Sequence, residues 1–320
     1  MGRLIDGIWQ TGSIQAGNDG RWQRSASLLR NWVTVDGSAG ISGREGFKAE
    51  HDRYHLYVAW NCPWAHRTLL FHHLKQLDGI VSISYAVPRR TDEGWVFEHA
   101  GEFTDALFGV TALHQLYTRN QSDYTGSVTV PILWDKETGT IVNNESADII
   151  RMFNSAFKDV APTTPDYRPA ALHAEIDAWN QRIYETVNNG VYRAGFASTQ
   201  AAYENAAIAV FDTLDAIEHQ LGKTRYLTGD TLTEADWQLF PTLVRFDVAY
   251  YSAFKCNLKR LIDYPNLWGY ARELYQMPGI AQTVRFDVYR KGYHSPSAQR
   301  NPHGIVPLGP FIDWDTPHER

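Results

Sequence analysis

The stretch AWNCPWAHRTLLFHHL, residues 59–74, places one of the two cysteines in this 320-residue chain between two different patterns. The residues before it, RYHLYVAW, are aromatic and β-branched and predict a buried strand over 55–61. Apolar residues after it recur at helical spacing and predict a helix over 62–77. Cys62 is therefore expected where a strand ends and a helix begins.

The start of the predicted helix favours a reactive thiol. Asn61 is the expected N-cap, and Pro63 fits the first turn because its missing N–H has no helical partner there. The N–H groups and the helix dipole favour a thiolate, and they can lower a cysteine pKa from about 8.5 to about 3.5–7.5. The alternative is a small buried hydrophobe, the usual role of a lone cysteine among apolar residues.

The position three residues after Cys62 indicates how a thiol cycle would end. In a C-x-x-C motif this position holds a resolving cysteine, but here it is Ala65. A mixed disulfide on Cys62 would therefore need a second thiol from outside. The only other cysteine is Cys256, so no disulfide framework is expected.

Composition limits the classes of function. Lys and Arg number 30 and Asp and Glu 36, a formal net charge of −6, so no nucleic-acid partner is expected. The sequence has no run of 18 apolar residues, and its first residues show no signal-peptide pattern. We expect a soluble, cytoplasmic protein without a membrane partner.

The chain is long enough for two domains, and its patterns change at a Pro- and Thr-rich linker, PTTPDYRP. Residues 1–54 have no clear periodicity and predict an extension with little regular structure. Residues 55–158 read as strand, helix, strand, a long insertion, two strands and a helix. Residues 166–290 carry helical apolar stripes, including a capping-box pattern in LTEADW, and 291–320 predict a tail that folds back on the body.

A proline interrupts the apolar run SVTVPILWD, which is otherwise a strand pattern. Pro131 donates no ladder hydrogen bond and is out of place unless it serves a geometric purpose. A cis Val130–Pro131 bond would turn the Val130 backbone outward and leave it free to pair with a peptide ligand. The base rate for cis bonds before proline is only about 5–6%, so the pattern alone does not establish it.

The order of these elements resembles the glutathione transferases, and the resemblance covers nearly the whole chain. Several motifs look more narrowly like the glutathionyl-hydroquinone reductases, or Xi-class glutathione transferases: NCPWAHR, DEGWVFE, TVPILWD, NNESADIIRM, LTEADW, LVRFDVAYYSAFKCN, YQMPGI and NPHGIVPLGP. The resemblance implies an α/β plus all-α fold, a thioredoxin-like domain followed by an all-helical domain. It also implies a homodimer, with glutathione as co-substrate and no metal.

The resemblance further implies a glutathione site. Its members are Trp95, the backbone of Val130, a cis Pro131, and Glu145 with Ser146. The last two begin a predicted helix, whose N–H groups and the Ser146 hydroxyl could hold a carboxylate while Glu145 accepts from an amino group. Without the resemblance, an ordinary helix cap is the favoured interpretation of this pair.

Three tyrosines complete the family pattern: Tyr192 in GVYRAGF, Tyr250 in DVAYYSAF and Tyr293 in KGYHSPS. Tyr251 adjoins Tyr250, so that assignment could move by one residue. Each tyrosine alone would more often be a packing residue. Together they could place phenolic donors opposite Cys62.

The implied reaction is reduction of a glutathionyl-hydroquinone by attack of the Cys62 thiolate on the thioether sulfur, with free glutathione resolving the mixed disulfide. The alternatives are an omega-like glutathione transferase with thioltransferase or dehydroascorbate reductase activity, a non-catalytic scaffold, and a metalloenzyme. The 12 histidines show no H-E-x-x-H pattern, which disfavours the last.

Overall fold

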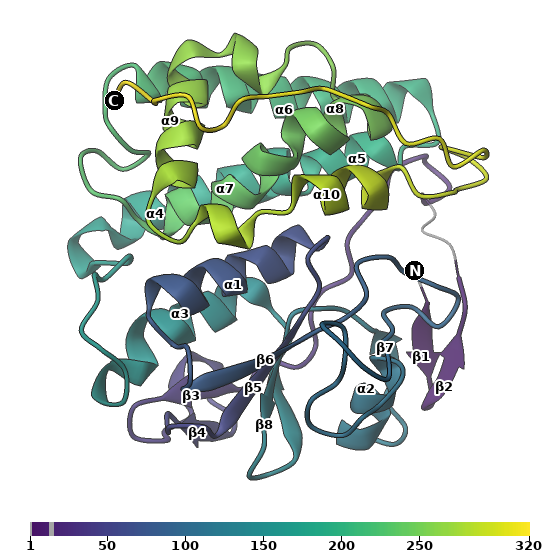
Figure 1. Ribbon diagram of the computed structural model, residues 1–320, viewed down its shortest axis with the longest axis vertical. Coiled ribbons are helices and arrows are strands. Elements are labelled where there is room, and N and C mark those ends of the chain that lie inside the picture. The colour runs from purple at the N-terminus through teal and green to yellow at the C-terminus, as the bar shows by residue number, and fades with distance from the viewer. Residues whose placement is uncertain (1, 13–15) are drawn as a thin grey trace. The chain divides into compact units, whose positions relative to one another are not determined.

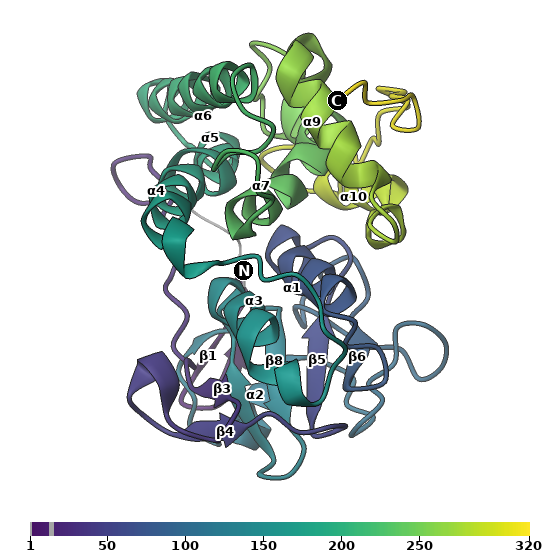
Figure 2. The same ribbon diagram turned by 90° about the vertical axis from the view of Figure 1, so that its left-hand side faces the viewer.

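The computed structural model describes residues 2–12 and 16–320, which form two compact units (Figures 1 and 2). The first unit comprises residues 2–12 and 25–166. The second comprises residues 16–24 and 167–320. The short segment 16–24 thus belongs with the helical part of the chain although it precedes the first unit's sheet.

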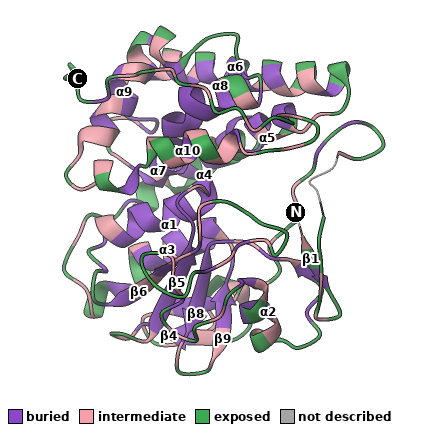
Figure 3. Cartoon of the chain, turned by 45° about the vertical axis from the view of Figure 1, so that its right-hand side comes forward, coloured by how far each residue is buried: buried purple, intermediate pink, exposed green. Residues whose placement is uncertain are grey.

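The first unit is built on a four-stranded sheet in the order β6-β5-β8-β9. The first two strands are parallel, as a connecting helix allows, and the hairpin β8-β9 runs antiparallel to β5. All residues of β5 and β8 are buried (Figure 3), and α1 packs beside α3. This is the thioredoxin-like order that the patterns predicted. The elements are β5 Tyr54–Val58, α1 Pro63–Leu74, β6 Val81–Tyr85, α2 His114–Asn120, β8 Ile132–Asp135, β9 Thr140–Asn143, α3 Ser146–Ser155 and the 3₁₀ turn η2 Ala156–Asp159.

The long insertion between β6 and β8 contains a helix that the sequence did not predict. This helix, α2, has seven residues and contacts β9. Its buried side chains are Leu116 and Tyr117. Two apolar positions in seven residues are too few to establish a helical period.

The expectation of little regular structure before residue 54 is wrong in part. Two short strands, β1 and β2, pair with each other, β1 also pairs with β7, and two more strands form a separate parallel pair. Each has two or three residues, too short for the alternation that identifies a strand. They are β1 Arg3–Ile5, β2 Ile8–Gln10, β3 Trp32–Thr34, β4 Gly46–Lys48 and β7 Gly126–Ser127, with the 3₁₀ turn η1 Gly40–Ser42 between β3 and β4.

The segment SVTVPILWD, predicted as one strand, divides into two. Its first residue ends β7, and β8 begins only at Ile132. The division lies at Pro131, which cannot donate to a sheet ladder. The Val130–Pro131 peptide bond is cis, as the resemblance implied.

The second unit is helical, as predicted. Ile176, Val210, Leu214 and Ile217 lie on its apolar stripes and are completely buried. No helix in the described ranges is both long enough and apolar enough to cross a bilayer. The elements are η3 Ala170–Leu172, α4 His173–Ile183, η4 Tyr184–Asn188, α5 Gly190–Gly195, α6 Gln200–Leu221, α7 Glu234–Arg245, η5 Phe246–Tyr250, α8 Tyr251–Ala253, η6 Leu261–Asp263, α9 Pro265–Gln276, η7 Ala281–Thr283 and α10 Phe286–Tyr293.

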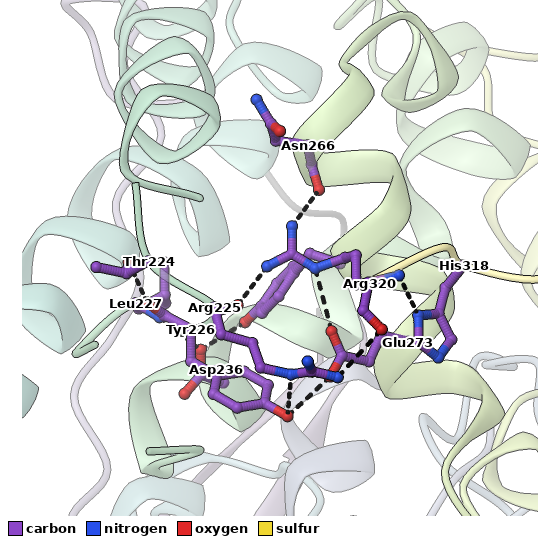
Figure 4. A network of polar contacts seen from close by, with 10 residues as sticks. Thr224, Arg225, Tyr226, Leu227, Asp236, Asn266, Glu273, His318 and Arg320 are labelled. Atoms are coloured by element: carbon purple, nitrogen blue, oxygen red, sulfur yellow. Dashed lines mark hydrogen bonds and ion pairs between the residues drawn. The ribbon is translucent and has the colours of Figure 1, made fainter. Parts of the chain in front are cut away.

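The residues after α10 return along α9, where a polar network holds the last residue (Figure 4). The Arg320 guanidinium donates to the Glu273 carboxylate at 3.1 Å and to the carbonyls of Asn266 and Arg225. Arg225 donates to the same carboxylate at 2.9 Å. Glu273 is only 4% exposed, so two guanidinium groups balance its buried charge. Because α10 extends to Tyr293, that tyrosine lies on a helix and not in the predicted tail.

The predicted capping box at the start of α7 is present, and its acid also joins distant segments. Asp236 accepts from the Thr233 N–H at 2.8 Å, from the Leu227 N–H at 3.0 Å and from the Tyr270 hydroxyl at 2.8 Å. The carboxylate is completely buried. One side chain thus satisfies three buried donors from three elements.

We predict that Asp236→Ala lowers the free energy of unfolding by about 3 kcal/mol or more, because each buried donor left without an acceptor costs about 1–3 kcal/mol. Denaturant melts measure the change. The matched control is Asp263→Ala, which removes an acid of the same capping type from the more exposed turn η6. That substitution should cost about 1 kcal/mol. Equal losses in the two variants would contradict the role assigned to Asp236.

Candidate active site

Cys62 is the N-cap of α1, one residue later than the predicted cap at Asn61. The shift follows from Pro63, which occupies the first helical position, where its fixed φ is already helical. The Cys62 carbonyl accepts the first helical hydrogen bond, from the His66 N–H at 3.0 Å. The thiol is therefore held at the N-terminus of a 12-residue helix, as predicted.

The Cys62 thiol faces the backbone that precedes the cis proline. Its Sγ lies 3.5 Å from the carbonyl oxygen of Val130, to which the thiol donates, and the side chain is 7% exposed. In the described part of the chain no hydrogen bond engages the Val130 N–H. This backbone thus retains a donor beside the thiol, which is what an extended peptide ligand needs for pairing.

Glu145 and Ser146 begin α3, and the structure shows the capping role that the sequence left open. Glu145 is the N-cap, and its Oε1 accepts from the Ala147 N–H at 3.2 Å. Its Oε2 accepts from the Ser27 hydroxyl at 2.9 Å. Each carboxylate oxygen can accept about two hydrogen bonds, so capping leaves capacity for an ammonium donor.

The residues that hold this corner include part of the N-terminal extension, which sequence reasoning did not assign to the site. Besides the Ser27 contact, Arg30 forms a bidentate ion pair with Asp148, with both distances 2.7 Å. The Leu29 backbone exchanges hydrogen bonds with Asn144 through its N–H and its carbonyl. Segment 27–30 therefore lies along the start of α3 and fixes the Glu145 carboxylate. No sequence motif predicts this contact, because it joins residues more than 100 positions apart.

Tyr117, on the helix that the sequence missed, joins the two loops of the site. Its hydroxyl donates to the Thr129 carbonyl at 2.9 Å and accepts from the Thr129 N–H at 3.2 Å. It also accepts from the Asn144 side-chain amide at 3.2 Å. Thr129 precedes Val130 and Asn144 precedes Glu145, so one buried hydroxyl sets the spacing of both binding loops.

Trp95 lies in the insertion of the same unit and is 4% exposed. The Arg90 guanidinium lies 4.7 Å from its ring centroid. Its indole N–H is buried and has no partner among the described residues. None of the hydrogen bonds and ring contacts in residues 2–12 and 16–320 joins Trp95 directly to Cys62, Val130 or Glu145. An unsatisfied buried donor is costly, which makes this N–H a candidate for a ligand contact.

In the second unit the three predicted tyrosines come together through their hydroxyl groups. The oxygens of Tyr192 and Tyr293 are 2.6 Å apart, those of Tyr250 and Tyr293 3.2 Å, and those of Tyr192 and Tyr250 3.4 Å. It is Tyr250, and not its neighbour Tyr251, whose hydroxyl joins this cluster. Residues from three helical segments thus meet in one triangle of oxygens.

Two π-helical turns lead into the elements that carry these tyrosines. The turn η4 precedes α5, which carries Tyr192, and η5 ends at Tyr250. Such turns occur frequently at functional sites because they change the direction of the side chains that follow. Phe254 stacks on Tyr250 and lies edge-on to Tyr293, so aromatic packing also orients the hydroxyls.

Burial controls the protonation of the groups around this cluster. It raises the pKa of Tyr250 and of Tyr293 well above 10, and Tyr192 raises both further. In the same unit, burial raises the pKa of the Cys256 thiol to about 12, so this second cysteine remains a thiol at neutral pH. No group of three or more potential metal ligands occurs in the described ranges.

Family models match both halves of the chain. Residues 61–156 match the glutathione S-transferase N-terminal domain, and residues 200–273 match the glutathione S-transferase C-terminal domain. The two matches correspond to the thioredoxin-like sheet and to the helical unit described above.

Full-length relatives are also similar. The glutathionyl-hydroquinone reductase YqjG of Escherichia coli K12 is 51% identical over all of this chain and 98% of the relative, and PcpF of Sphingobium chlorophenolicum is 45% identical over 97% and 96%. The solved glutathione-bound structure of YqjG superposes with a TM-score of 0.92 at 48% identity, covering 100% and 99% of the two chains. The Xi-class transferase of Natrialba magadii gives 0.91 at 43% identity, covering 100% and 96%.

A thioredoxin-like unit followed by a helical unit is the domain order of the glutathione transferases. With these relatives, the chain belongs to that superfamily and, within it, to the Xi class that contains the glutathionyl-hydroquinone reductases.

We predict that Tyr117→Phe weakens glutathione binding and lowers the free energy of unfolding by about 2 kcal/mol or more. The substitution leaves the Thr129 N–H and the Asn144 amide without their acceptor at little change in volume. Calorimetric titration with glutathione and denaturant melts measure the two effects.

The matched control is Tyr124→Phe. Its ring lies 5.1 Å from that of Tyr117 and is equally buried, but its hydroxyl makes only a 3.5 Å contact with the Ser127 carbonyl. This variant should bind glutathione like the wild type. The same loss of affinity in both variants would show that Tyr117 contributes packing alone.

Proposed function

We propose that this protein reduces glutathionyl-hydroquinones to hydroquinones with glutathione as the reductant. Two observations, one in each unit, support the proposal: a thiol at a helix N-terminus beside a backbone N–H without a partner in the described residues, and a triangle of three phenols. The thiol provides a nucleophile for the sulfur of the substrate. The phenols provide donors for the oxygens of a hydroquinone ring.

The thiolate of Cys62 attacks the glutathione sulfur of the thioether. An S–S bond forms, the bond between the ring carbon and sulfur breaks, and its electron pair stays on the ring carbon, which takes up one proton. The hydroquinone leaves, and glutathione remains on Cys62 as a mixed disulfide. A second glutathione thiolate attacks the glutathione sulfur of that disulfide, so that oxidised glutathione leaves and the Cys62 thiolate returns. The ring gains two electrons and the two glutathione sulfurs lose them.

Tyr192, Tyr250 and Tyr293 assist the breaking of the bond between the ring carbon and the sulfur. A thioether sulfur is a poor electrophile unless the ring carbon leaves as a better leaving group, which protonation through the keto tautomer achieves. The phenols donate to the ring oxygens and favour that tautomer. The absence of a cysteine at Ala65 fits the same cycle, because no internal thiol competes with the second glutathione.

Glutathione itself has donors and acceptors for its peptide groups at the site. The Val130 backbone, next to Pro131, pairs with the cysteinyl part of the tripeptide. The N-terminus of α3, with Ser146 and Glu145, holds the γ-glutamyl carboxylate and its ammonium group. Trp95 donates its indole N–H to the bound tripeptide. Glutathione is a co-substrate in this proposal, and no metal takes part.

An omega-like activity on mixed disulfides or dehydroascorbate is the second candidate. The observation that favours it is a relative in Schizosaccharomyces pombe, named glutathione S-transferase omega-like 2, which is 40% identical over 92% of this chain and 94% of its own length. Such an activity needs Cys62 but not three phenols. The test is turnover of a glutathionyl-hydroquinone, a protein mixed disulfide and dehydroascorbate under one set of conditions. Activity on only the last two substrates overturns the main proposal.

We also propose that the protein works in the cytoplasm as a homodimer. Both proposals rest on the resemblance to the Xi class and on the use of free thiols, which a reducing compartment maintains. The mass of the native protein, measured by light scattering over a range of concentrations, tests the dimer. A monomer at all concentrations contradicts it.

We predict that Cys62→Ser abolishes reduction, because an alcohol of much higher pKa supplies no nucleophile at nearly the same volume. Cys256→Ser is the matched control and should keep most of the activity, since its thiol is buried and protonated. Intact-mass measurement after incubation with substrate, without free glutathione, should show one glutathione adduct in the wild type and in the control variant. An adduct on Cys256 is incompatible with the mechanism.

We predict that Trp95→Phe raises the KM for glutathione-bearing substrates about 2- to 12-fold, the equivalent of one net hydrogen bond. Phenylalanine keeps most of the buried ring and removes the N–H. Trp237→Phe is the matched control, because Trp237 is also buried with an indole N–H that has no partner in the described residues. An unchanged KM in Trp95→Phe would return Trp95 to a packing role.

A further inference from the structure

The tyrosine triangle has a property that three separate phenols lack. Each of its oxygens lies within 3.4 Å of the other two. When one hydroxyl loses its proton, the resulting phenolate can therefore accept hydrogen bonds from both remaining hydroxyls. Bonds to an ionised acceptor are roughly twice as strong as neutral ones. The cluster is thus arranged to release one proton, provided that the negative charge left in a buried place is balanced.

A buried guanidinium group lies over Tyr289, one helical turn from Tyr293 of this cluster. Arg245 is the last residue of α7 and is completely buried. Its Nη1 donates to the Pro241 carbonyl at 2.8 Å, and its Cζ lies 3.7 Å from the centroid of the Tyr289 ring. Tyr289 is one helical turn before Tyr293 on α10, so both side chains share a face of that helix. Tyr250 ends the π-helical turn that starts directly after Arg245.

A second guanidinium approaches from the residues after α10. The Cζ of Arg300 lies 4.4 Å from the centroid of Phe196 and 5.5 Å from that of Phe254. Phe196 stacks against Tyr192, and Phe254 stacks against Tyr250. Arg300 therefore borders the same aromatic cluster. Its side chain is bound by ring contacts, a mode in which a cation keeps its charge next to apolar groups.

The electrostatic coupling between these groups acts in both directions. Burial disfavours the charged form of Arg245, but the oxygens of Tyr289, Tyr293, Tyr250 and Tyr192 outweigh it, and the pKa of Arg245 is raised. In return the Arg245 charge opposes the burial and phenol effects that raise the pKa of Tyr250 and of Tyr293. A positive charge near a phenol favours the phenolate.

The other charged groups on the neighbouring elements are engaged elsewhere. On η5, Asp247 accepts from the Leu261 N–H at 2.6 Å. After α10, the His294 ring bonds to the Ser252 hydroxyl at 2.8 Å. On α5, Arg193 donates to the Glu185 carbonyl, and on α10, Arg290 donates to the Leu308 carbonyl. Arg245 and Arg300 are the cations whose charge acts on the cluster oxygens.

We propose that Arg245 is a positioning residue that allows the tyrosine cluster to act as a proton donor: its guanidinium stabilises the phenolate that remains when one of the three hydroxyls gives its proton to the substrate ring. The proton moves to the ring carbon as the electron pair of the broken carbon–sulfur bond arrives there. The phenolate then takes a proton from solvent before the next cycle. Arg300 contributes to the same balance of charge. The substrate in this inference rests on the proposed function, whereas the effect of the Arg245 charge on the phenols does not.

The test replaces Tyr293 with a fluorotyrosine, whose phenol is more acidic than that of tyrosine, and measures its ionisation by absorbance. In this protein Arg245→Met should raise the pKa of the fluorinated phenol by about 1 to 3, the effect of removing an opposite charge at close range. Arg245→Lys keeps the positive charge, so its phenol pKa should lie at least part of the way back toward the wild-type value. Arg182→Met is the matched control, because Arg182 is an exposed arginine over the Trp179 ring at 5.9 Å. It should leave the pKa unchanged.

The kinetic arm uses the natural tyrosines and measures single-turnover formation of hydroquinone against pH. Arg245→Met should slow this step about tenfold or more and shift the alkaline limb of its pH profile, while glutathione binding stays as in the wild type. An unchanged phenol pKa in a folded Arg245→Met protein overturns the inference, and so does an Arg245→Lys protein whose phenol pKa is the same as that of Arg245→Met. If wild type fails to turn over glutathionyl-hydroquinones while the phenol pKa still depends on Arg245, the proposed function is wrong and the electrostatic coupling stands.

Discussion

The site in the first unit depends on one close approach, that of the Cys62 sulfur to the carbonyl of Val130. The thiol is there because β5 ends at Val58, a short turn follows, and Pro63 starts α1 directly after Cys62. The Val130 backbone can be there only because the chain turns at Pro131 before β8 begins. The thiol and the Val130 backbone thus lie at the ends of adjacent, hydrogen-bonded strands. Strands of a sheet lie about 4.8 Å apart, which brings such residues within contact distance.

Buried polar groups then hold the surroundings of that contact. Tyr117 joins the loop before Val130 to the loop before Glu145, and the Arg30–Asp148 pair fastens the N-terminal segment to α3. Such groups are costly to bury unless each finds a partner, so they favour a single arrangement of the backbone around them. The two loops before Val130 and Glu145 are therefore held at a fixed spacing by buried hydrogen bonds.

In the helical unit, buried polar groups also find partners, and one of these groups is charged. Hydrogen bonds join the three phenols in a triangle, and the Arg245 guanidinium supplies a positive charge while it is buried from solvent. In a medium of low dielectric constant an opposite charge several ångströms away changes acidity strongly. The Arg245 charge therefore offsets part of the effect of burial, which holds the pKa of Tyr250 and of Tyr293 above the value of about 10 that tyrosine has in water.

Prediction from sequence succeeded where a local pattern carries the information. The strand before Cys62, the helix after it and the capping box at Asp236 follow from spacing, proline and cap residues within a few positions. Predictions failed where elements are short. The seven-residue α2 and the three-residue strands near the N-terminus contain too few positions to show a period, although α2 carries the hydroxyl that joins both loops. The cis Pro131 and the grouping of the tyrosines came from the family resemblance, since neither has a local signature.

The sequence by itself determined that a cysteine begins a helix in a thioredoxin-like order, because backbone propensity and hydrophobic period act between near neighbours. The tertiary structure alone decided that Tyr250 and not Tyr251 joins the cluster, that the Ser27 hydroxyl donates to the carboxylate of Glu145, and that the Arg245 guanidinium lies over the Tyr289 ring. These contacts join residues far apart in the chain. They depend on how the helices pack and on where π-helical turns redirect side chains. The energy of that packing is distributed over many residues, so no single segment of the sequence predicts it.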